Sequence, residues 1–349
     1  MTGAVPLTPV TATLQEAFDA AAASGDRLAV LGHPDGTVAG VVTDADVRRA
    51  VLHGAALDSP VLEIVSPNPL LVSVDDSDED VRDLLTSRGV PAAAAIDAAG
   101  RLSGVRRLRE LDPAAALPPV AVLMVGGRGE RLRPLTDKVP KPLLRIGGAT
   151  IVERLIDSMR QAGVEEFYLT LNYLAEQFED ELGDGADRGV RISYVREQEA
   201  MGTAGSLSLL PPISAPLLVS NGDLVTTIDF AAMLDFHRYH HAAITVAGVE
   251  YAATVPYGVL RTADHHLLHI DEKPTTRQLV SGGIYVLSPE VLRYVPRGTA
   301  FTMPDLIAAA LRDGLAVTVF PVLERWSDIG SKEELERVLY ESAVEKESS

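Results

Sequence analysis

The chain has 349 residues, a formal net charge of −18 and no cysteine. This length favours two domains over one. The acidic balance argues against binding to nucleic acid or to an anionic membrane, since both need a positive surface. The lack of cysteine excludes disulfides and cysteine metal sites, and it agrees with a cytoplasmic protein. We find no apolar run long enough to cross a membrane, and residues 1–10 do not resemble a signal peptide.

Two segments within the first 115 residues resemble each other. Gly36–Val41 and Gly100–Val105 share the pattern Gly-x-apolar-x-Gly-Val. Each follows an apolar segment and precedes a charged, helix-like one. A helix with a capping box at Thr13–Glu16 precedes the first segment, and Asp78–Arg88 is its counterpart before the second. The repeat predicts two α/β units packed as a pseudo-symmetric pair.

Residues 111–119 are rich in proline and alanine and indicate a linker. Strands and helices then alternate, with a capping box at Thr150 and Glu153 opening a helix that ends at Gly163. The predicted strands are Val120–Val125, Phe167–Leu171, Ile192–Val195 and Leu217–Ser220. Such alternation predicts a parallel sheet with both faces covered, whose ligands bind at the carboxyl ends of the strands. We therefore expect Gly126-Gly127 and Gly222-Asp223 to meet at one cleft.

The richest segment is Gly126–Thr136, with the sequence GGRGERLRPLT, followed by PKPL at residues 140–143. Glycines after a buried strand let backbone N–H groups approach a phosphate closely. Arg131 and Lys141 add positive charge there, and prolines on both sides of Lys141 fix the backbone that carries it. The segment is not a Walker A loop. It is also not a dinucleotide fingerprint, because Leu132 stands where the third glycine belongs, which disfavours an oxidoreductase.

This string resembles the signature of the sugar-phosphate nucleotidyltransferases, and further segments resemble that family's landmarks in the same order. They are Met201–Gly205, Asn221–Asp223, Pro256–Val259, Glu272–Pro274, Gly282–Tyr285 and Trp326–Gly330. The resemblance covers Val120 to Glu341. It implies an α/β fold with a Rossmann-like, mostly parallel sheet of the GT-A-like kind in a catalytic domain over residues 119–349.

The resemblance also implies a reaction and its site residues. A sugar 1-phosphate oxygen attacks the α-phosphorus of a nucleoside triphosphate, and pyrophosphate leaves. Such a transfer between polyanions needs alignment and charge neutralisation, and Mg²⁺ prefers carboxylate and phosphate oxygens. The implied catalytic residues are Arg131, Lys141, Asp223 and Asp328, the two aspartates being the Mg²⁺ ligands. The implied nucleotide-binding residues are Gly126, Gly127, Gly129, Glu197, Gly202 and Thr203. The implied sugar phosphate-binding residues are Gly258, Glu272, Lys273, Ser281 and Gly282.

The base and the sugar are less constrained by the sequence. Glu197 lies where the family often places a side chain that faces the base, and a carboxylate suits the two N–H donors of guanine. We therefore favour GTP, with ATP, CTP, UTP and dTTP left open. Two residues depart from the family pattern. Glu130 replaces a small Thr or Ser in the glycine loop, and Ser281 replaces an Asn that touches the sugar in relatives.

The N-terminal repeat resembles a pair of CBS domains over residues 1–115. Residues 40–46 match the motif G-x-x-[ST]-x-x-D, which implies that Thr43 and Asp46 hold an adenine nucleotide. Arg107 and Glu110 occupy the equivalent positions of the second repeat, so at most one such site is intact. The pair is then either regulatory or a dimerising element. Enzymes with this arrangement make nucleotide-activated amino sugars or activate related cyclitol phosphates, so a cyclitol phosphate is an alternative acceptor.

We expect a homo-oligomer, formed through the CBS pair or through the catalytic domain. A different class of function remains open as well. The protein could be a catalytically inactive sensor that binds nucleotides and regulates a partner, although Arg131, Lys141, Asp223 and Asp328 argue against that reading.

Overall fold

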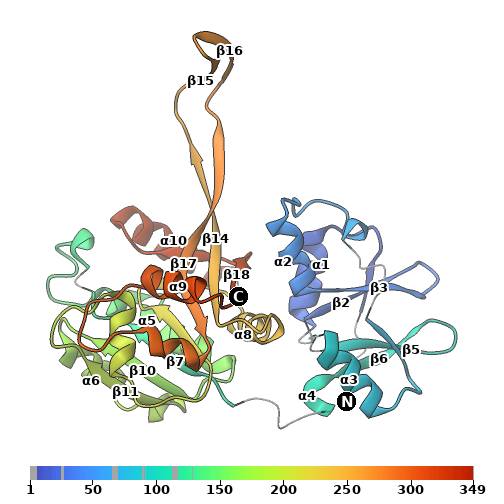
Figure 1. Ribbon diagram of the computed structural model, residues 1–349, viewed down its shortest axis with the longest axis horizontal. Coiled ribbons are helices and arrows are strands. Elements are labelled where there is room, and N and C mark those ends of the chain that lie inside the picture. The colour runs from blue at the N-terminus through green and yellow to red at the C-terminus, as the bar shows by residue number, and fades with distance from the viewer. Residues whose placement is uncertain are drawn as a thin grey trace.

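The computed structural model describes residues 6–24, 27–64, 70–88, 90, 92–111, 117–127 and 129–348. It has two parts that lie side by side, with a long hairpin arm rising from the C-terminal part (Figure 1). The predicted linker falls largely on residues 112–116, which lie outside the described residues. None of the described helices is long and apolar enough to pass through a lipid bilayer.

The N-terminal part contains two small sheets with the same connectivity, in the orders β1-β2-β3 and β4-β5-β6. In each sheet a parallel pair is followed by an antiparallel hairpin, and the glycine at its turn has a positive φ, 84° at Gly36 and 73° at Gly100. The two related segments therefore form equivalent hairpins, as predicted. The elements are β1 (Leu7–Pro9), α1 (Leu14–Ala23), β2 (Leu28–Gly32), β3 (Val38–Thr43), α2 (Asp44–Leu52), η1 (Val61–Glu63), β4 (Leu71–Ser73), α3 (Asp78–Arg88), β5 (Ala92–Ile96), β6 (Leu102–Arg107) and α4 (Leu108–Leu111).

The C-terminal part is built on a seven-stranded sheet in the order β11-β10-β7-β12-β17-β14-β18. Strand β17 runs antiparallel to both of its neighbours, and the other described pairs in this sheet are parallel. The strands are β7 (Val120–Met124), β10 (Glu166–Leu171), β11 (Arg191–Arg196), β12 (Leu217–Asn221), β14 (Ile244–Thr254), β17 (Thr275–Leu287) and β18 (Val317–Val322). The mostly parallel sheet and the predicted strands are confirmed.

Helices cover both faces of this sheet, because its strands are apolar on both sides. One core cluster joins the sheet to α5 (Ile151–Gln161), α6 (Ala175–Leu182) and α8 (Phe230–Tyr239). A second cluster joins the opposite face to α7 (Gly202–Gly205) and α9 (Met303–Arg312). The capping box of Thr150 and Glu153 opens α5 as predicted. This layering leaves the carboxyl ends of the strands as the open edge.

Short elements line that edge. They are η2 (Glu130–Leu132), η3 (Lys141–Leu143), the hairpin β8 (Arg145–Ile146) with β9 (Ala149–Thr150), and the antiparallel ladder of β13 (Leu224–Thr226) with β19 (Trp326–Asp328). The C-terminal helix α10 (Lys332–Ser348) packs there through Leu335 and Val338. Elsewhere lie η4 (Ala186–Arg188), η5 (Ser206–Leu209) and η6 (Pro289–Tyr294).

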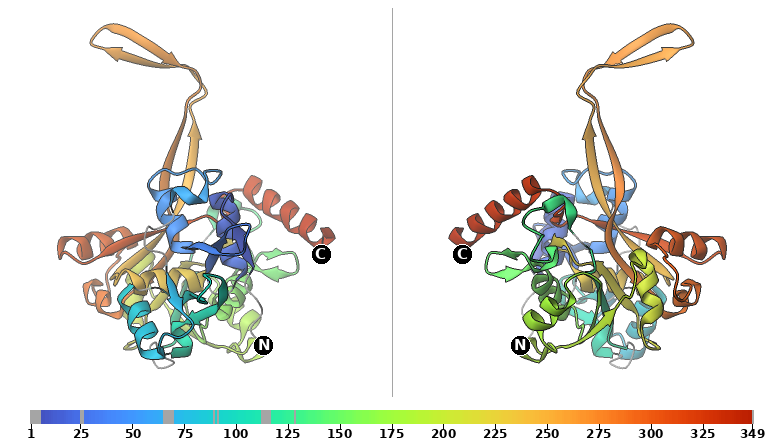
Figure 2. Two further views of the ribbon diagram at one scale, coloured as in Figure 1. Left: turned by 90° about the vertical axis from the view of Figure 1, so that its right-hand side faces the viewer. Right: turned by 90° about the vertical axis from the view of Figure 1, so that its left-hand side faces the viewer.

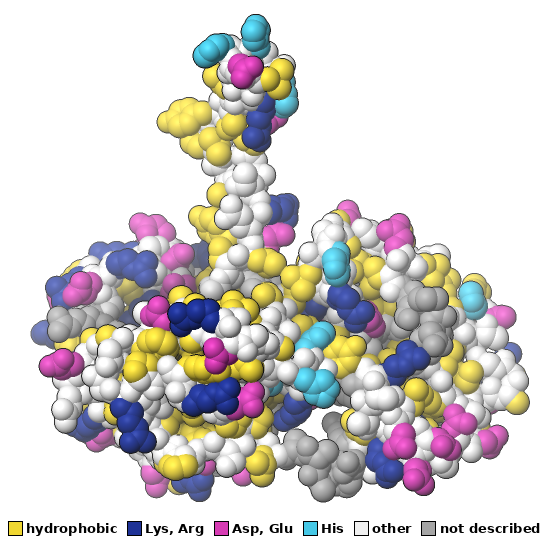
Figure 3. All heavy atoms as spheres, viewed as in Figure 1, with side chains coloured by type: hydrophobic (Ala, Val, Ile, Leu, Met, Phe, Trp, Pro, Cys, Tyr) yellow, Lys and Arg dark blue, Asp and Glu magenta, His cyan; other side chains and the backbone are white. Residues whose placement is uncertain are grey.

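Strands β14 and β17 continue past the sheet as a paired ribbon that ends in the hairpin β15 (Val259–Ala263) and β16 (His266–Asp271). We call residues 250–281 the arm. The arm projects well beyond the rest of the protein and bends near its tip (Figure 2). Its surface carries exposed apolar side chains and three histidines (Figure 3), and Leu260 and Leu268 are 61% and 64% exposed. The sequence did not indicate that this segment projects from the fold.

Candidate active site

A cavity of about 310 Å³ opens at the carboxyl ends of the central strands. Its lining comes from the end of β7, the glycine loop, η3 and the segment after β19: Met124, Val125, Gly127, Gly129, Glu130, Arg131, Leu132, Lys141, Pro142, Asp223, Ile329 and Gly330. Gly222 lies against Val125, and its N–H donates to the carbonyl of Met124 at 2.9 Å. The cleft predicted between the two glycine segments is therefore present.

The glycine loop folds back onto η3, which sets the position of Lys141. Gly129 has a φ of 60°, and a Cβ there would lie 3.2 Å from the Cβ of Lys141. The Thr136 hydroxyl donates to the Gly129 carbonyl at 2.7 Å and holds the loop closed. Only glycine adopts this conformation without strain while allowing so close an approach. Arg128 lies outside the described residues.

Lys141 and the two aspartates of the predicted site are in direct contact. The Lys141 ammonium lies 2.6 Å from Oδ2 of Asp223 and 3.2 Å from Oδ1 of Asp328. The lysine side chain is only 7% exposed, whereas those of Asp223 and Asp328 are 31% and 41% exposed. A buried ammonium needs such partners, because an unpaired charge is costly away from water. The sequence separates these residues by up to 187 positions, and the fold brings them together.

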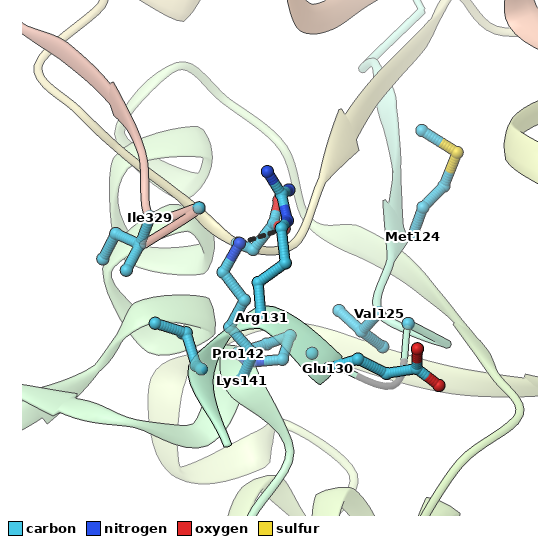
Figure 4. A pocket seen from close by; sticks show the side chains of 12 residues that line it. Met124, Val125, Glu130, Arg131, Lys141, Pro142 and Ile329 are labelled. Atoms are coloured by element: carbon cyan, nitrogen blue, oxygen red, sulfur yellow. Dashed lines mark hydrogen bonds and ion pairs between the residues drawn. The ribbon is translucent and has the colours of Figure 1, made fainter. Parts of the chain in front are cut away.

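Arg131 points to the same side of the cavity as Lys141 (Figure 4). Its guanidinium packs against Gly330, where a Cβ would lie 3.1 Å from Nη1. One oxygen of Glu334 accepts the backbone N–H groups of Gly330 and Ser331, at 2.7 and 3.0 Å. Glu334 thus holds the turn that follows Asp328, and we had not singled it out from the sequence. The signal was present, because Ser331 and Glu334 have the spacing of a capping box.

Glu130, the acidic residue of the glycine loop, directs its carboxylate away from Lys141 and Arg131 (Figure 4). The residue is exposed. Its negative charge is therefore turned away from the Lys141 and Arg131 cations, although Glu130 stands in the glycine loop.

Glu197 follows β11 at the same edge of the sheet and is half-buried. One of its oxygens accepts the N–H of Met201 at 3.1 Å, which closes the loop before α7. Burial raises the pKa of Glu197, and the Met201 hydrogen bond acts in the opposite direction. Gly202 has a φ of 75°, and the Thr203 hydroxyl accepts the N–H of Met303 at the start of α9. These residues are not among those that line the cavity.

The predicted sugar-side residues separate into two groups. Ser281 and Gly282 lie at the base of the arm, where the Ser281 and Tyr285 hydroxyls are 2.9 Å apart and the Gly282 carbonyl accepts Nε1–H of Trp326. Gly258, Glu272 and Lys273 instead lie beyond the ribbon, because β14 and β17 stay paired up to Thr254 and Thr275. These three residues do not line the cavity. The structure does not bring them to the cluster of Lys141, Asp223 and Asp328.

Thr43 and Asp46, the residues predicted to bind an adenine nucleotide, form the capping box of α2. The Thr43 hydroxyl lies 2.7 Å from Oδ2 of Asp46, and Arg49 pairs with the same aspartate at 2.8 Å. Thr43 is buried, with 6% of its surface exposed. Both residues thus have a local structural role within the N-terminal part, and any role in nucleotide binding stays a prediction.

Among the described residues, no group of three or more His, Cys, Asp or Glu side chains is placed to hold a metal ion. Asp223 and Asp328 nevertheless bracket one cation position, since both contact the same ammonium. Two carboxylates are a suitable protein contribution to a Mg²⁺ site, because this ion usually keeps several waters and takes phosphate oxygens as well. The donor set therefore fits Mg²⁺ bound together with a phosphorylated ligand.

Comparison with known proteins identifies the families of the two parts of the chain. Residues 120–344 match the nucleotidyl transferase family, and residues 1–53 match the CBS domain. The first match covers more than half of the chain, so this protein belongs to the nucleotidyl transferase family. The N-terminal match identifies a CBS domain in front of it.

Two individual relatives are 32% and 30% identical to this chain. The chain is similar to the mannose-1-phosphate guanylyltransferase of Mycobacterium tuberculosis, with 32% identity over 225 residues, which is 62% of either chain. It is also similar to the UTP–glucose-1-phosphate uridylyltransferase of Synechocystis sp., with 30% identity over 60% of either chain. The chain thus spans less than two thirds of the length of these relatives. HddC from Yersinia pseudotuberculosis, complexed with GMP-PN, shares the fold at a TM-score of 0.50 and 22% identity, over 64% of this chain and 99% of that one.

Proposed function

We propose that this protein catalyses the Mg²⁺-dependent transfer of a nucleoside monophosphate, from GTP in preference to other triphosphates, to a sugar 1-phosphate or a cyclitol phosphate. The observation that carries the proposal is the contact of Lys141 with both Asp223 and Asp328, next to a glycine loop at the open edge of the sheet. Membership of the nucleotidyl transferase family supports the class of reaction.

In the proposed reaction an oxygen of the acceptor phosphate forms a bond to the α-phosphorus, and the bond between that phosphorus and the bridging oxygen breaks. Pyrophosphate leaves with the electron pair. Mg²⁺ held by Asp223 and Asp328 would supply neutralisation of the phosphate charge. Lys141 and Arg131 would bind phosphate oxygens, because both cations point into the cavity (Figure 4). Backbone N–H groups of Gly126, Gly127 and Gly129 would orient the triphosphate.

The preference for GTP is part of the proposal. It is supported by Glu197, whose half-buried carboxylate lies at the carboxyl end of β11, and by relatives named as guanylyltransferases. A relative named as a uridylyltransferase shows that similarity alone does not fix the base. Gly202 and Thr203 would flank the base, and Ser281 and Gly282 would contact the acceptor. Gly258, Glu272 and Lys273 could contact the acceptor only if the arm moved toward the cavity.

We further propose that residues 1–115 form a CBS pair and residues 119–349 the catalytic domain, with an adenine nucleotide at Thr43 and Asp46 as the regulatory ligand. We place the enzyme in the cytoplasm, in agreement with its lack of cysteine.

Association with a second copy through the arm is the form of homo-oligomer that we propose. Paired side chains of a hairpin point to the same face, so Leu260 and Ile270 form an apolar patch, and they are 61% and 53% exposed. A two-stranded hairpin is only marginally stable in water by itself. Residues 250–281 hold three Lys or Arg and four Asp or Glu, a net charge of −1 against −18 for the chain. The arm is therefore close to neutral, and charge repulsion between two arms is small.

The test is a panel of nucleoside triphosphates against several sugar 1-phosphates and cyclitol phosphates, read by Mg²⁺-dependent release of pyrophosphate. We expect turnover with GTP and at least one acceptor. Asp223→Asn should lower turnover by orders of magnitude and leave the protein folded. Turnover that is independent of Mg²⁺, or near-normal activity of Asp223→Asn, would remove the proposed metal site. No turnover with any pair would favour a nucleotide-binding sensor.

A further inference from the structure

The N-terminal domain is joined to the catalytic domain by a buried arginine. Arg48, on α2, is 1% exposed. Its guanidinium makes two contacts with the Glu324 carboxylate, at 2.6 and 3.1 Å, and donates to the Pro321 carbonyl. Pro321 lies near the end of β18 and Glu324 lies just after it, both in the catalytic domain. The fork geometry of arginine suits such a two-point contact with a carboxylate.

The surroundings of Arg48 come from both domains. Asp44, one turn earlier on α2, pairs with its Nε at 3.0 Å. The guanidinium also lies 5.0 Å from the ring centroid of Phe18 in α1 and 4.0 Å from that of Phe320 in β18. Cation–π contacts of this kind are strongest where water is excluded. The arginine therefore contacts two acidic groups and two aromatic rings. Each domain supplies one acidic group and one ring.

A second arginine, Arg27, binds the same region of the catalytic domain. Arg27 donates to Asp229 at 3.2 Å and pairs with Asp235. Asp229 directly precedes α8, and Asp235 lies near the middle of that helix. The Asp229 N–H lies 3.4 Å from Oε1 of Glu324, which connects the two contacts. Leu323 packs against the apolar core of the first N-terminal sheet. Arg48 and Arg27 of the N-terminal domain thus bind Glu324 and Asp229, which are themselves joined by a hydrogen bond.

Glu324 and Asp229 lie at one end of the β13–β19 ladder, and the proposed metal ligands lie at the other. The register pairs Thr226 with Trp326 at the first end and Leu224 with Asp328 at the second. Asp223 directly precedes Leu224. The ladder has three residue pairs, so its two end pairs are about 7 Å apart at the usual rise of a strand.

The connection between the domain contact and the ladder is tight. The Arg325 carbonyl accepts both the Thr226 hydroxyl and the Thr227 N–H, at 2.8 and 3.0 Å, so the residue after Glu324 is fixed to the end of β13. A two-stranded ladder of this length has little stability of its own. Its position therefore depends on the packing of Leu224 and Trp326 against the core and on what holds its ends. The N-terminal domain holds the end opposite the aspartates.

We propose that Arg48 is a positioning residue for the nucleotidyl transfer: through Glu324 and the β13–β19 ladder it fixes the spacing of Asp223 and Asp328. The inference rests on the proposed function of that aspartate pair. It makes the N-terminal domain a structural part of the active site, whatever ligand that domain binds. Removal of Arg48 would leave the carboxylates of Asp44 and Glu324 without their shared cation, and the segment around Glu324 would move to reach water.

The first measurement uses hydrogen exchange of the full-length protein and needs no substrate. We expect Arg48→Met to speed exchange about tenfold in peptides that cover residues 222–229 and 323–330, because the ladder loses its anchor. Peptides from β7 and β10 should be unchanged. Glu324→Gln tests the same link from the catalytic side if Arg48→Met does not fold. Arg106→Met is the matched control, since Arg106 pairs with Asp78 within the N-terminal domain.

The second measurement is the concentration of Mg²⁺ that gives half-maximal turnover. We expect it to rise about tenfold in Arg48→Met and less in Arg48→Lys, which keeps one charge but not the fork. A loss of folded protein alone would lower kcat and leave this concentration unchanged. Unchanged exchange in the ladder, or an unchanged Mg²⁺ requirement, would overturn the proposal. If the wild type shows no turnover, the proposed function fails, and the exchange experiment still decides whether Arg48 holds the ladder.

Discussion

The ammonium of Lys141 lies 2.6 Å from the carboxylate of Asp223, inside the cavity that we propose as the active site. The same ammonium reaches Asp328 at 3.2 Å. It therefore occupies the space between two carboxylates that a divalent cation would bridge. An ammonium has three donors on a flexible stem, so Lys141 can turn from the aspartates to phosphate oxygens when a metal–triphosphate complex enters.

Replacement of Lys141 by Met should reveal this dual role. Without the ammonium, Asp223 and Asp328 repel each other in metal-free protein. Because both are partly exposed, we expect a loss of about 1–2 kcal/mol of stability in the presence of EDTA, less than for a fully buried pair. Mg²⁺ should restore most of this loss, and turnover should fall at least about 100-fold. Thermal unfolding with EDTA and with Mg²⁺, together with pyrophosphate release, measures both effects.

Lys138→Met is the control for that experiment, because Lys138 lies in the same segment and does not line the cavity. It should behave as the wild type in both assays. If Lys141→Met kept turnover within threefold of the wild type, the proposal that Lys141 binds phosphate would be wrong.

Glu197→Gln should weaken the preference for guanine. A glutamine side chain presents one acceptor and one donor group. One of the two guanine N–H donors would then face the NH₂ donor of glutamine and lose its hydrogen bond. We expect kcat/KM for GTP to fall roughly 10- to 100-fold and that for UTP to change little. Glu199→Gln, two residues further along an exposed stretch, is the matched control. Equal losses with GTP and UTP would show that Glu197 supports the loop through Met201 without contacting the base.

The same carboxylate predicts a pH effect on base choice. Burial raises the pKa of Glu197, so its acceptor form is present above that pKa and is lost as the pH falls through it. The ratio of kcat/KM for GTP to that for UTP should therefore be lower at pH 5 than at pH 8. In Glu197→Gln the ratio should be the same at both pH values.

The sequence predicted the site better than it predicted the molecule around it. Lys141 and Asp223 could be placed together because parallel strands deliver their following loops to one edge of a sheet. Asp328 was added to them only by the resemblance to a family. Thr150 and Glu153 marked the start of a helix, because a capping box depends only on residues within four positions of each other. Apart from that of Asp328, these predictions need only neighbouring residues and one rule of topology.

The contacts between domains could not be predicted in this way. Arg48 reads as a charged residue on an amphipathic helix, and its burial is created by Glu324 and Phe320, more than 270 positions away. The arm contains apolar residues and a turn, as does a hairpin that packs on a core. Such features are local. The projection of Gly258, Glu272 and Lys273 from the fold depends instead on how far β14 and β17 remain paired.

The arm gives a prediction about assembly. If the patch at Leu260 and Ile270 packs against a second copy, serine at both positions should shift the protein toward monomer. Sedimentation velocity over a range of protein concentrations measures this shift. Arg261→Gln, on the opposite face of the hairpin, should leave the oligomeric state unchanged. A wild type that is monomeric at all concentrations would contradict the proposal, as would an oligomer that the double variant leaves intact.

His237 should make the protein less stable in mild acid. It is 4% exposed on α8, with Nδ1 2.9 Å from the Thr245 hydroxyl and Nε2 3.1 Å from the Ser288 hydroxyl. The Ser288 hydroxyl donates to the Ala242 carbonyl, so it can only accept from Nε2–H, and Nδ1 in turn accepts from Thr245. The neutral ring is thus fully bonded. Burial, with a smaller contribution from Arg238, lowers its pKa to about 4.

The sign of the effect follows from the two pKa values. Below about pH 6.5 the unfolded chain binds a proton at this histidine, whereas the folded protein does not until about pH 4. Stability contributed by the neutral ring is therefore present above pH 6.5 and is lost as the pH falls toward 4. Between pH 7 and pH 5 this amounts to about 2 kcal/mol.

Urea unfolding of the wild type and of His237→Gln at pH 7 and pH 5 measures this contribution. The variant is expected to be less stable at pH 7, because glutamine does not reproduce both hydrogen bonds, but to lose about 2 kcal/mol less between the two pH values. His265→Gln, at the exposed tip of the arm, is the control and should keep the wild-type dependence on pH. If His237→Gln lost as much stability as the wild type over this range, the buried histidine would not be the group that responds to acid.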